Sequence, residues 1–298
     1  MDVRGLAYVV VDAVDPHQWI SFGEDVLGMQ AFKTPDGGVR LKMDERAARY
    51  YVRPAKSDRY AISGWEVADE AAFENAKSDL QRAGVNFTQG DKALAIARNV
   101  IDLIAFKDPS GNHHELSWGH RSDYQRMVSP AGVSSFVTGD QGMGHTVLPA
   151  PNFDETWRFF RDVMGFGMAD LMVHRPGGET GPAMRINFTH CNNPRHHSLA
   201  LFEGEVASGC VHVMIEYQDM DEVGRAMDRA VKNRAKLMAS LGRHINDGVV
   251  SFYIQSPAGF AFEIGYGGRR IDWADHIAFE STAASLWGHD FSIGFSNV

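Results

Sequence analysis

Cysteine is scarce in this sequence, and its scarcity disfavours two kinds of protein. Among 298 residues only Cys191 and Cys210 are cysteines, and no Cys-x-x-Cys pair occurs. A disulfide-stapled fold and a zinc site built from thiolates are therefore not expected. Two isolated cysteines are typical of a protein that works in the reducing cytoplasm, which we predict as its location.

Long hydrophobic runs and blocks of one charge are absent too. No stretch approaches the ~20 apolar residues of a transmembrane helix, and residues 1–5 lack the charged-then-apolar pattern of a signal peptide. The net charge of −9, with both signs interspersed, disfavours nucleic acid and membranes as partners. The composition, 44% hydrophobic and 22% charged, is that of an ordinary globular protein with room for two modest domains.

An internal repeat divides the chain. Residues 5–29 align with residues 142–166 without a gap, and both segments predict an apolar strand, a polar turn and an amphipathic helix that ends at a glycine. Later in each half, residues 107–116 resemble residues 255–264, and both segments contain a Pro-x-Gly turn before a strand. Each half therefore has the same order of elements, which predicts two tandem domains.

A further helix is predicted between these segments in each half, over residues 70–83 and over residues 221–237. The periodicity breaks at residues 129–132. We therefore assign residues 1–135 to the first domain and residues 136–298 to the second. A single domain with chance similarity is the alternative, and the gapless match of the first segments argues against it.

Two aligned positions carry polar side chains that bear on chemistry, and the halves differ at one of them and agree at the other. His145 of the second half lies opposite Tyr8 of the first half. A glutamate occurs at the same place in both halves, as Glu115 and Glu263. The second half therefore adds an imidazole to a carboxylate that both halves have.

A second histidine opens a strand in the same half. His212 begins an apolar run, and its loosely matching position in the first half is about Tyr60. Because alternate residues of a strand share a face, His145, His212 and Glu263 are expected to project from three strands onto one face. A buried carboxylate is costly unless it is paired or metal-bound. Two histidines and one carboxylate form the facial triad of non-haem Fe(II) oxygenases.

Each of these residues also has an ordinary interpretation. One histidine among thirteen, taken alone, is more often a surface or hydrogen-bonded residue than a metal ligand. Glu263 alone could be a salt-bridge partner. Chance placement of all three on corresponding strands of a duplicated fold is much less plausible, so the pattern predicts a metal site.

A second polar cluster occurs in the same half. Residues 191–200 run from a turn into a strand and contain adjacent histidines, His196 and His197. Residues 242–248 form another turn, Gly-Arg-His-Ile-Asn-Asp-Gly, which contains His244 and leads into a strand. Such stretches are often plain solvated turns, but beside a metal they supply acid–base groups at neutral pH.

These motifs together resemble the type I extradiol ring-cleavage dioxygenases of the vicinal oxygen chelate superfamily, in particular the two-domain group typified by 2,3-dihydroxybiphenyl 1,2-dioxygenase. The segments that carry the resemblance are residues 193–200, 242–247, 251–253 and 262–267, and the similarity extends over nearly the whole chain. The resemblance implies an α+β fold of paired βαβββ modules, two per domain, in which each domain is an incomplete mixed β-barrel flanked by helices. The first domain is then a degenerate one that binds no metal.

The same resemblance implies the cofactor, the substrates and the assembly. Fe(II) is expected at His145, His212 and Glu263 of the second domain only, and Mn(II) suits the same ligands. The expected reaction is extradiol cleavage of a bicyclic or biaryl catechol, such as 2,3-dihydroxybiphenyl, with O2 in the degradation of aromatic compounds. Members of the family are commonly homo-oligomers, often octamers.

Several residues acquire roles from the resemblance. His197 is implied to be the acid–base histidine, and His196 is expected to point to the opposite face if this segment is extended. The residues implied to lie at or near the bound diol are His244, Asn246, Asp247 and Tyr253. Three apolar residues near the predicted site could contact a second ring or could be plain core: Val147, Phe188 and Phe202. Many relatives carry a histidine where this chain has Gly248, which leaves the exact diol open.

Two other functions fit the same fold. A glyoxalase- or lyase-like enzyme would use a divalent metal as a Lewis acid, usually with ligands from both paired modules and an extra carboxylate. A ligand-binding protein without catalytic activity would need neither the metal nor the two-histidine, one-carboxylate set. His197, His244 and Tyr253 favour the dioxygenase over both alternatives.

Overall fold

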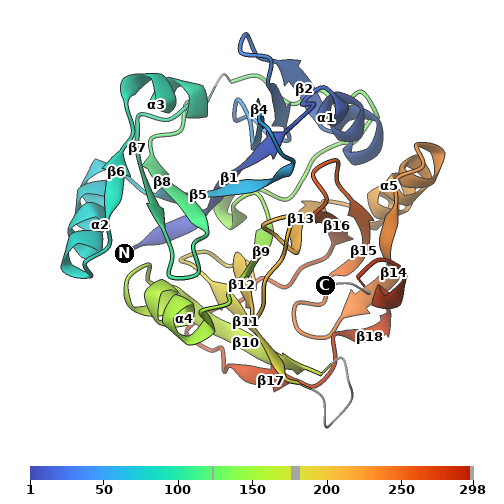
Figure 1. Ribbon diagram of the computed structural model, residues 1–298. Helices are drawn as coiled ribbons and strands as arrows, with labels where there is room; N and C mark the ends of the chain where they lie inside the picture. The colour runs from blue at the N-terminus through green and yellow to red at the C-terminus, as the bar shows by residue number, and fades with distance from the viewer. Residues whose placement is uncertain (123, 176–181, 296–298) are drawn as a thin grey trace.

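The computed structural model describes residues 1–122, 124–175 and 182–295. These residues form two large mixed β-sheets, one from each part of the chain, and the longer helices lie at the periphery of the molecule (Figure 1). No helix in the described ranges is both long and apolar enough to cross a membrane.

The first sheet contains eight strands in the order β2-β3-β4-β1-β5-β8-β7-β6. Its strands are β1 (Val3–Ala13), β2 (Gln30–Lys33), β3 (Val39–Lys42), β4 (Tyr50–Pro54), β5 (Arg59–Val67), β6 (Phe87–Gln89), β7 (Asp102–Lys107) and β8 (His113–Trp118). The helical segments of this part are α1 (Gln18–Ser21), η1 (Phe22–Leu27), α2 (Glu70–Arg82) and α3 (Lys92–Arg98).

The second sheet contains ten strands in the order β17-β10-β11-β12-β9-β13-β16-β15-β14-β18. Its strands are β9 (His145–Pro149), β10 (Gly167–His174), β11 (Met184–His190), β12 (Leu199–Phe202), β13 (His212–Tyr217), β14 (Leu237–His244), β15 (Val250–Gln255), β16 (Ala261–Tyr266), β17 (Phe279–Ser281) and β18 (Ser285–Gly288). The helical segments of this part are η2 (Gly139–Gln141), α4 (Phe153–Asp162), α5 (Met220–Lys232) and η3 (Phe291–Ile293).

Each sheet is built from two βαβββ units. In the first sheet the units meet where β1 pairs antiparallel with β5, and β5 pairs parallel with β8. In the second sheet β9 pairs antiparallel with β13 in the same way, and β13 pairs parallel with β16. The structure thus confirms the predicted α+β fold of paired βαβββ modules. The short strands β17 and β18 extend the second sheet at its two edges and have no counterpart in the first sheet.

The two longest helices begin in the same way and pack through one apolar face. Asp69 caps α2 by accepting a hydrogen bond from the Ala72 backbone N–H, and Asp219 caps α5 by accepting one from the Asp221 backbone N–H. The predicted end of the second helix at residue 237 was wrong, because α5 ends at Lys232. Arg234 has a φ of 56°, which ends the helical path, and Leu237 already belongs to β14.

An aromatic core joins the two halves of the molecule. Trp19 and Phe22 follow β1, and their rings lie 6.1 and 5.4 Å from the ring of Phe262 in β16. The ring of Tyr50 in β4 lies 5.4 Å from the same ring. One face of β16 packs in this buried core. Because side chains alternate along a strand, the other residues of β16 project from the opposite face of the second sheet.

Candidate active site

Three neighbouring strands bring His145, His212 and Glu263 together. His145 of β9 pairs with Met214 of β13, and Met214 pairs in turn with Glu263 of β16. His212 lies two residues before Met214, on the same face of the sheet. The strand register alone therefore places the two imidazoles and the carboxylate side by side.

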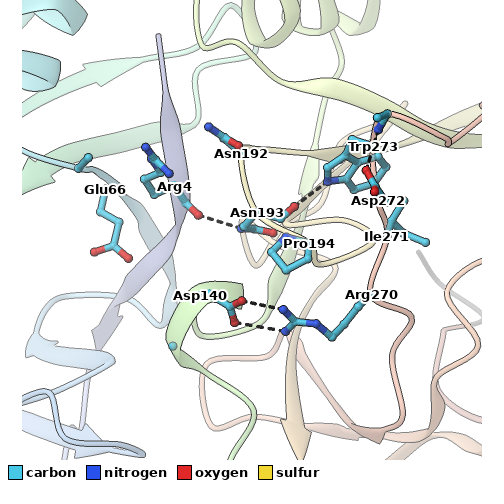
Figure 2. A pocket seen from close by; sticks show the side chains of 13 residues that line it. Arg4, Glu66, Asp140, Asn192, Asn193, Pro194, Arg270, Ile271, Asp272 and Trp273 are labelled. Carbon is cyan, nitrogen blue, oxygen red and sulfur yellow. Dashed lines mark hydrogen bonds and ion pairs between the residues drawn. The ribbon is translucent and has the colours of Figure 1, made fainter.

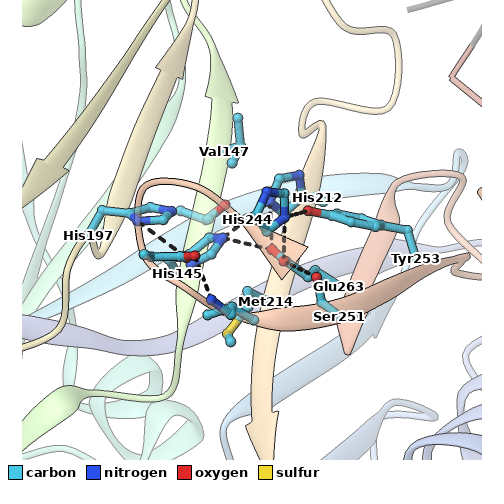
Figure 3. A network of polar contacts seen from close by, with 12 residues as sticks. His145, Val147, His197, His212, Met214, His244, Ser251, Tyr253 and Glu263 are labelled. Atoms are coloured by element: carbon cyan, nitrogen blue, oxygen red, sulfur yellow. Dashed lines mark hydrogen bonds and ion pairs between the residues drawn. The ribbon is translucent and has the colours of Figure 1, made fainter. Parts of the chain in front are cut away.

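The ligand atoms of these three residues converge closely. Oε2 of Glu263 lies 3.2 Å from Nε2 of His145 and 3.2 Å from Nε2 of His212, and the two Nε2 atoms are 3.1 Å apart. Figure 3 shows the three side chains pointing toward one another inside the sheet. Among the described residues they form a group of donors whose atoms all lie within 4.8 Å of one another.

The donor set fits a divalent metal ion. Donor atoms at right angles about one ion, at ordinary bond lengths of about 2.2 Å, are about 3.1 Å apart. Burial lowers the pKa of His145 to about 4, so its imidazole is neutral and has a lone pair to give. Burial alone would raise the pKa of Glu263, but hydrogen bonds from His145, His212 and His244 hold it well below its usual value. The site therefore offers two imidazole nitrogens and one carboxylate.

The equivalent positions of the first half hold a different arrangement. Tyr8 pairs with Gly64, and Gly64 pairs with Glu115, as His145, Met214 and Glu263 do in the second half. The residue two before Gly64 is Ile62, so the counterpart of His212 is Ile62. Our assignment of this position to about Tyr60 was wrong, because the two pairings at Gly64 fix the register of β5.

The carboxylate of the first half is already neutralised by the chain. Oε2 of Glu115 accepts hydrogen bonds of 2.7 Å from the Tyr8 hydroxyl and 2.7 Å from Nε of Arg98, and Oε1 accepts one of 3.0 Å from Nη2 of Arg98. This bidentate ion pair is buried. A guanidinium has no lone pair for a metal, so these residues are a structural group.

His197 lies beside the three converging residues. Its ring centroid is 4.0 Å from that of His145 and 5.0 Å from that of Phe188. Nδ1 of His197 lies 3.1 Å from Nδ1 of His196, and both side chains are buried. The segment is not extended here, since the chain bends at these residues and β12 begins only at Leu199, so the condition under which His196 was expected to face the opposite side is not met.

His244 and Tyr253 lie on the other side of the carboxylate. Nε2 of His244 is 2.8 Å from the Tyr253 hydroxyl and 3.1 Å from Oε1 of Glu263, and Nδ1 is 2.9 Å from the Ala284 carbonyl. Burial would lower the pKa of His244, but the hydrogen bond and charge of Glu263 raise it to about 9. Burial raises the pKa of Tyr253 well above its ordinary value, so its hydroxyl keeps its proton.

Asn246 and Asp247 shape the turn between β14 and β15. The Asn246 side-chain oxygen accepts a 2.9 Å hydrogen bond from the Asp247 N–H, and Oδ1 of Asp247 accepts one of 2.9 Å from the Val249 N–H. Gly248 lies between Asp247 and Val249 and has a φ of +75°, a backbone conformation that favours glycine. The turn also returns the Val249 carbonyl to the His244 N–H at 3.0 Å, so it holds His244 in place.

An apolar wall continues from the polar group along β9, β11 and β12. Val147 lies two residues after His145, pairs with His212, and projects beside the polar group in Figure 3. Val147, Ala200 and Phe202 form one buried cluster, against which Phe188 packs. The three apolar residues named from the sequence, Val147, Phe188 and Phe202, therefore belong to one surface.

Two residues that the sequence reasoning missed complete the polar group. The Ser251 hydroxyl donates a 2.6 Å hydrogen bond to Oε1 of Glu263. Nε2 of His289 lies 3.2 Å from that hydroxyl, and the His289 ring stacks on His244 at 4.2 Å. Ser251 could have been found, because it alternates with Tyr253 along β15. His289 had no sequence signal, since it comes from the segment after the repeat.

A surface groove lies away from this site. A groove of about 890 Å³ runs between the start of β1 and the segment after β16. Figure 2 shows the Arg270–Asp140 ion pair across it and the Trp273 ring beside Asn193, whose carbonyl accepts from Nε1 of Trp273 at 2.7 Å. Its lining, within the described part of the chain, contains none of the predicted site residues.

Comparisons with known protein families agree with this geometry. Residues 142–264 match the Glyoxalase/Bleomycin resistance protein/Dioxygenase superfamily. Residues 6–54 match the family described as dihydroxybiphenyl dioxygenase BphC D1. The first match covers the three converging residues, and the second covers the first βαβββ unit.

Individual proteins match over nearly the full length. The chain is 44% identical to an iron-dependent extradiol dioxygenase of Rhodococcus jostii, over 99% of both chains. It is 37% identical to biphenyl-2,3-diol 1,2-dioxygenase of Paraburkholderia xenovorans, over 97% of this chain and 96% of that protein. The crystal structure of BphC, a halotolerant catechol dioxygenase, superimposes with a TM-score of 0.89 at 34% identity, over 97% of this chain and 95% of the other.

Proposed function

The chain belongs to the extradiol ring-cleavage dioxygenases of the vicinal oxygen chelate superfamily, and we propose that it cleaves a bicyclic or biaryl catechol, such as 2,3-dihydroxybiphenyl, with O2. His145, His212 and Glu263 hold Fe(II), and the reaction serves the degradation of aromatic compounds. One observation carries the proposal: three ligand atoms converge at 3.1–3.2 Å beside a buried, neutral histidine, His197.

Iron held by His145, His212 and Glu263 would act as a Lewis acid that brings the diol and O2 together, which would fix their orientation and lower the cost of their encounter. The chain supplies the surroundings of this encounter. The apolar wall of Val147, Ala200 and Phe202 excludes water from one side. His197 and His244 approach from two other sides.

His197 is the group that moves a proton. Burial lowers its pKa well below the usual value, and the neighbouring imidazoles of His145 and His196 lower it further. A neutral imidazole at this place can accept a proton from a diol hydroxyl and return it as the ring opens. Acid–base assistance of this kind accelerates reactions by roughly 10²–10⁴-fold.

His244 and Tyr253 stabilise charge on the substrate oxygens. Both carry a proton at neutral pH, since the pKa of His244 is raised to about 9 and that of Tyr253 is raised well above its ordinary value. Hydrogen-bond donors held in place before the reaction stabilise a developing negative charge without having to reorganise. Asn246 and Asp247 act indirectly, because the turn that they form holds the backbone of His244 in place.

The choice of a two-ring diol rests on the apolar wall. Phe188 and Phe202 extend the surface that starts at Val147, beside the converging ligand atoms. A second aromatic ring placed against this wall is buried away from water. A single-ring catechol would leave part of the wall uncovered. The Paraburkholderia relative, which is named for a biaryl diol, supports the same choice.

Metal analysis and oxygen uptake together test the function. Protein purified without air is expected to contain about one iron per chain, and on mixing with 2,3-dihydroxybiphenyl in air it should consume one O2 per diol and form a yellow ring-opened product. A different divalent metal without oxygen uptake would point to a glyoxalase-like enzyme. Absence of bound metal would point to a ligand-binding protein.

The proposal includes a homo-oligomer, such as an octamer, in the cytoplasm. Both cysteines are buried and unpaired, as is common in a reducing compartment. Leu286 and Trp287 of the edge strand β18 are 61% and 49% exposed, and an apolar edge of this kind suits contact between subunits. Light scattering of the purified protein tests the assembly, and a monomer at micromolar concentration contradicts it.

A further inference from the structure

A second histidine and an aspartate stand behind the acid–base histidine. His196 and Asp170 are both buried, with 2% and 0% of their surfaces exposed. Nδ1 of His196 contacts Nδ1 of His197 at 3.1 Å, and Nε2 of His196 lies 3.9 Å from Oδ1 of Asp170. The three side chains therefore form a row that runs from the candidate active site to β10.

The contacts within this row restrict which ring nitrogens of His196 and His197 carry protons. Two Nδ1 atoms in contact need one donor and one acceptor, because a neutral imidazole carries its proton on a single nitrogen. If Asp170 accepts the proton on Nε2 of His196, Nδ1 of His196 is the acceptor. Nδ1 of His197 is then the donor, and Nε2 of His197 is the unprotonated nitrogen.

We propose that His196 and Asp170 are positioning residues that keep Nε2 of His197 free to accept the substrate proton. The inference rests on the proposed function, since it concerns the histidine to which the proton transfer was assigned. A histidine held in the wrong tautomer cannot act as a base at that nitrogen, however well it is placed.

The carboxylate of Asp170 is itself held in place. Its Oδ2 accepts a 3.0 Å hydrogen bond from the Ser281 hydroxyl of β17, and Oδ1 accepts one of 3.4 Å from Nδ2 of Asn246. Nε2 of His196 is buried and has no hydrogen-bond partner among the residues that the structure describes. An unpartnered buried N–H is costly, and the nearest carboxylate oxygen is the one at 3.9 Å. Hydrogen bonds of catalytic groups often shorten when the substrate binds.

The charge states agree with the proposed direction of donation. Burial raises the pKa of Asp170 to about 6, against the hydrogen bonds of Ser281 and Asn246, so the group is mainly ionised at pH 7. Burial lowers the pKa of His196 to about 4, so its ring is neutral. A second carboxylate oxygen, Oδ2 of Asp247, lies 4.0 Å from Nδ1 of His197, farther than the 3.1 Å contact with His196.

The fold itself does not require the two histidines. The equivalent pairs of Val9 with Tyr50 and of Thr146 with Leu199 place Ala47 and Ala48 of the first half at the positions of His196 and His197. The same βαβββ frame therefore forms with two alanines there. This argues that the histidine pair serves the chemistry of the second half, and it makes His196→Ala a substitution that the frame tolerates.

Two variants and two readouts test the proposal. Asp170→Asn places an amide opposite Nε2 of His196. The amide N–H can donate to Nε2 of His196, which moves the proton of His196 to Nδ1 and so reverses the direction of donation between His196 and His197. His196→Ala removes the contact to His197. For the iron-loaded enzyme we expect both variants to keep full iron content and the KM for 2,3-dihydroxybiphenyl within about threefold, while kcat falls by roughly 10–100-fold, as for other residues that orient a functional group.

The second readout does not depend on activity. In full-length protein loaded with diamagnetic Zn(II), nitrogen-15 spectra report which ring nitrogen of His197 carries the proton, with His197→Gln to assign the signal. We expect the proton on Nδ1 in the wild type and on Nε2 in Asp170→Asn. His190→Gln, a partly buried histidine that stacks on Trp273 outside the row, is the matched control and should change neither readout.

The outcomes separate this inference from the proposed function. Absence of iron-dependent oxygen uptake by the wild type overturns the proposed function, whatever the tautomer. A wild-type His197 with its proton on Nε2 overturns the positioning role. So does an active enzyme whose kcat is unchanged in Asp170→Asn and His196→Ala. If Asp170→Asn proves unstable, the tautomer of His197 in the wild type and the kcat of His196→Ala still test the positioning role.

Discussion

The two halves of the molecule place a glutamate at the same point of the same fold and neutralise it differently. In the first half Arg98 and Tyr8 bind the carboxylate of Glu115 at 2.7–3.0 Å. In the second half Nε2 atoms of His145 and His212 lie 3.2 Å from the carboxylate of Glu263. A guanidinium completes the first group within the chain, whereas two imidazoles and the carboxylate of the second group form a set that could hold a cation.

The frame around both groups is the same. An arginine at the same spacing before β4 and before β12 binds a glutamate, as Arg46 with Glu66 and Arg195 with Glu216, each at 2.7 Å. The residues that follow the arginine differ: alanines in the first half and His196 and His197 in the second half. The comparison shows that burial of one carboxylate is part of the fold, while the chemistry depends on a few side chains beside it.

The space next to the carboxylate differs as well. Tyr51 of β4 fills it in the first half, where its ring lies 5.4 Å from the ring of Tyr8. The strand pairings place Ala200 at the equivalent position of β12, opposite Val147. The second half therefore has a small side chain where the first half has an aromatic ring.

The largest effect is expected for Glu263→Gln. The amide removes the negative charge and weakens coordination, so the variant should lose its iron and essentially all ring cleavage. Iron content by elemental analysis and oxygen uptake with 2,3-dihydroxybiphenyl measure both losses. Stoichiometric iron together with more than a few per cent of activity would remove Glu263 from the site.

The next effect concerns His197, which the first half replaces by Ala48. His197→Gln keeps the approximate size of the side chain but cannot carry a proton at neutral pH. We expect near-normal iron content and diol binding, with turnover lowered by roughly 10²–10⁴-fold. Single-turnover kinetics and iron analysis check this. Loss of iron in this variant would make His197 a ligand or a structural residue.

A smaller effect is expected from substrate size. Burying a phenyl ring against the apolar wall contributes about 2 kcal/mol, so 2,3-dihydroxybiphenyl should bind roughly thirtyfold more tightly than catechol. Ala200→Phe refills the space as Tyr51 does in the first half and should abolish this preference while iron is retained. Binding of both diols under anaerobic conditions measures the ratio. Equal affinity of the wild type for both would contradict the biaryl assignment and leave ring cleavage standing.

The smallest effect on catalysis is expected for Glu115→Gln. Iron content and turnover should stay within about twofold of the wild type, because Glu115 is bound by Tyr8 and Arg98 and does not belong to the converging ligand group. The buried guanidinium of Arg98 loses its counter-charge, so stability should fall by about 3 kcal/mol. Urea unfolding measures the loss. The double variant Arg98→Met with Glu115→Gln should recover part of it, and an unaffected single variant would show that the ion pair contributes little.

Much of the fold and of the candidate site was predictable from the sequence. The gapless repeat indicated two halves with the same order of elements, because both copies carry the same strand, turn and helix signals, and the family resemblance implied that each half contains paired βαβββ modules. The three residues proposed as metal ligands followed from the alternation of side chains along regular strands, which the pairing of His145, Met214 and Glu263 preserves. Both inferences use local rules that hold wherever the backbone is regular.

Other features depended on contacts that no local rule describes. His196 contacts His197 because the chain bends before β12, so the alternation of a strand does not apply there. The register that makes Ile62 the counterpart of His212 is set by two pairing partners distant in sequence.

His289 reaches the site only because the segment after the repeat folds back along β14. The sequence by itself determined the modules, the buried glutamates and the imidazoles available to them. Only the tertiary structure decided which of these groups touch, because bends, strand register and the return of a distant segment are settled by packing of the whole chain.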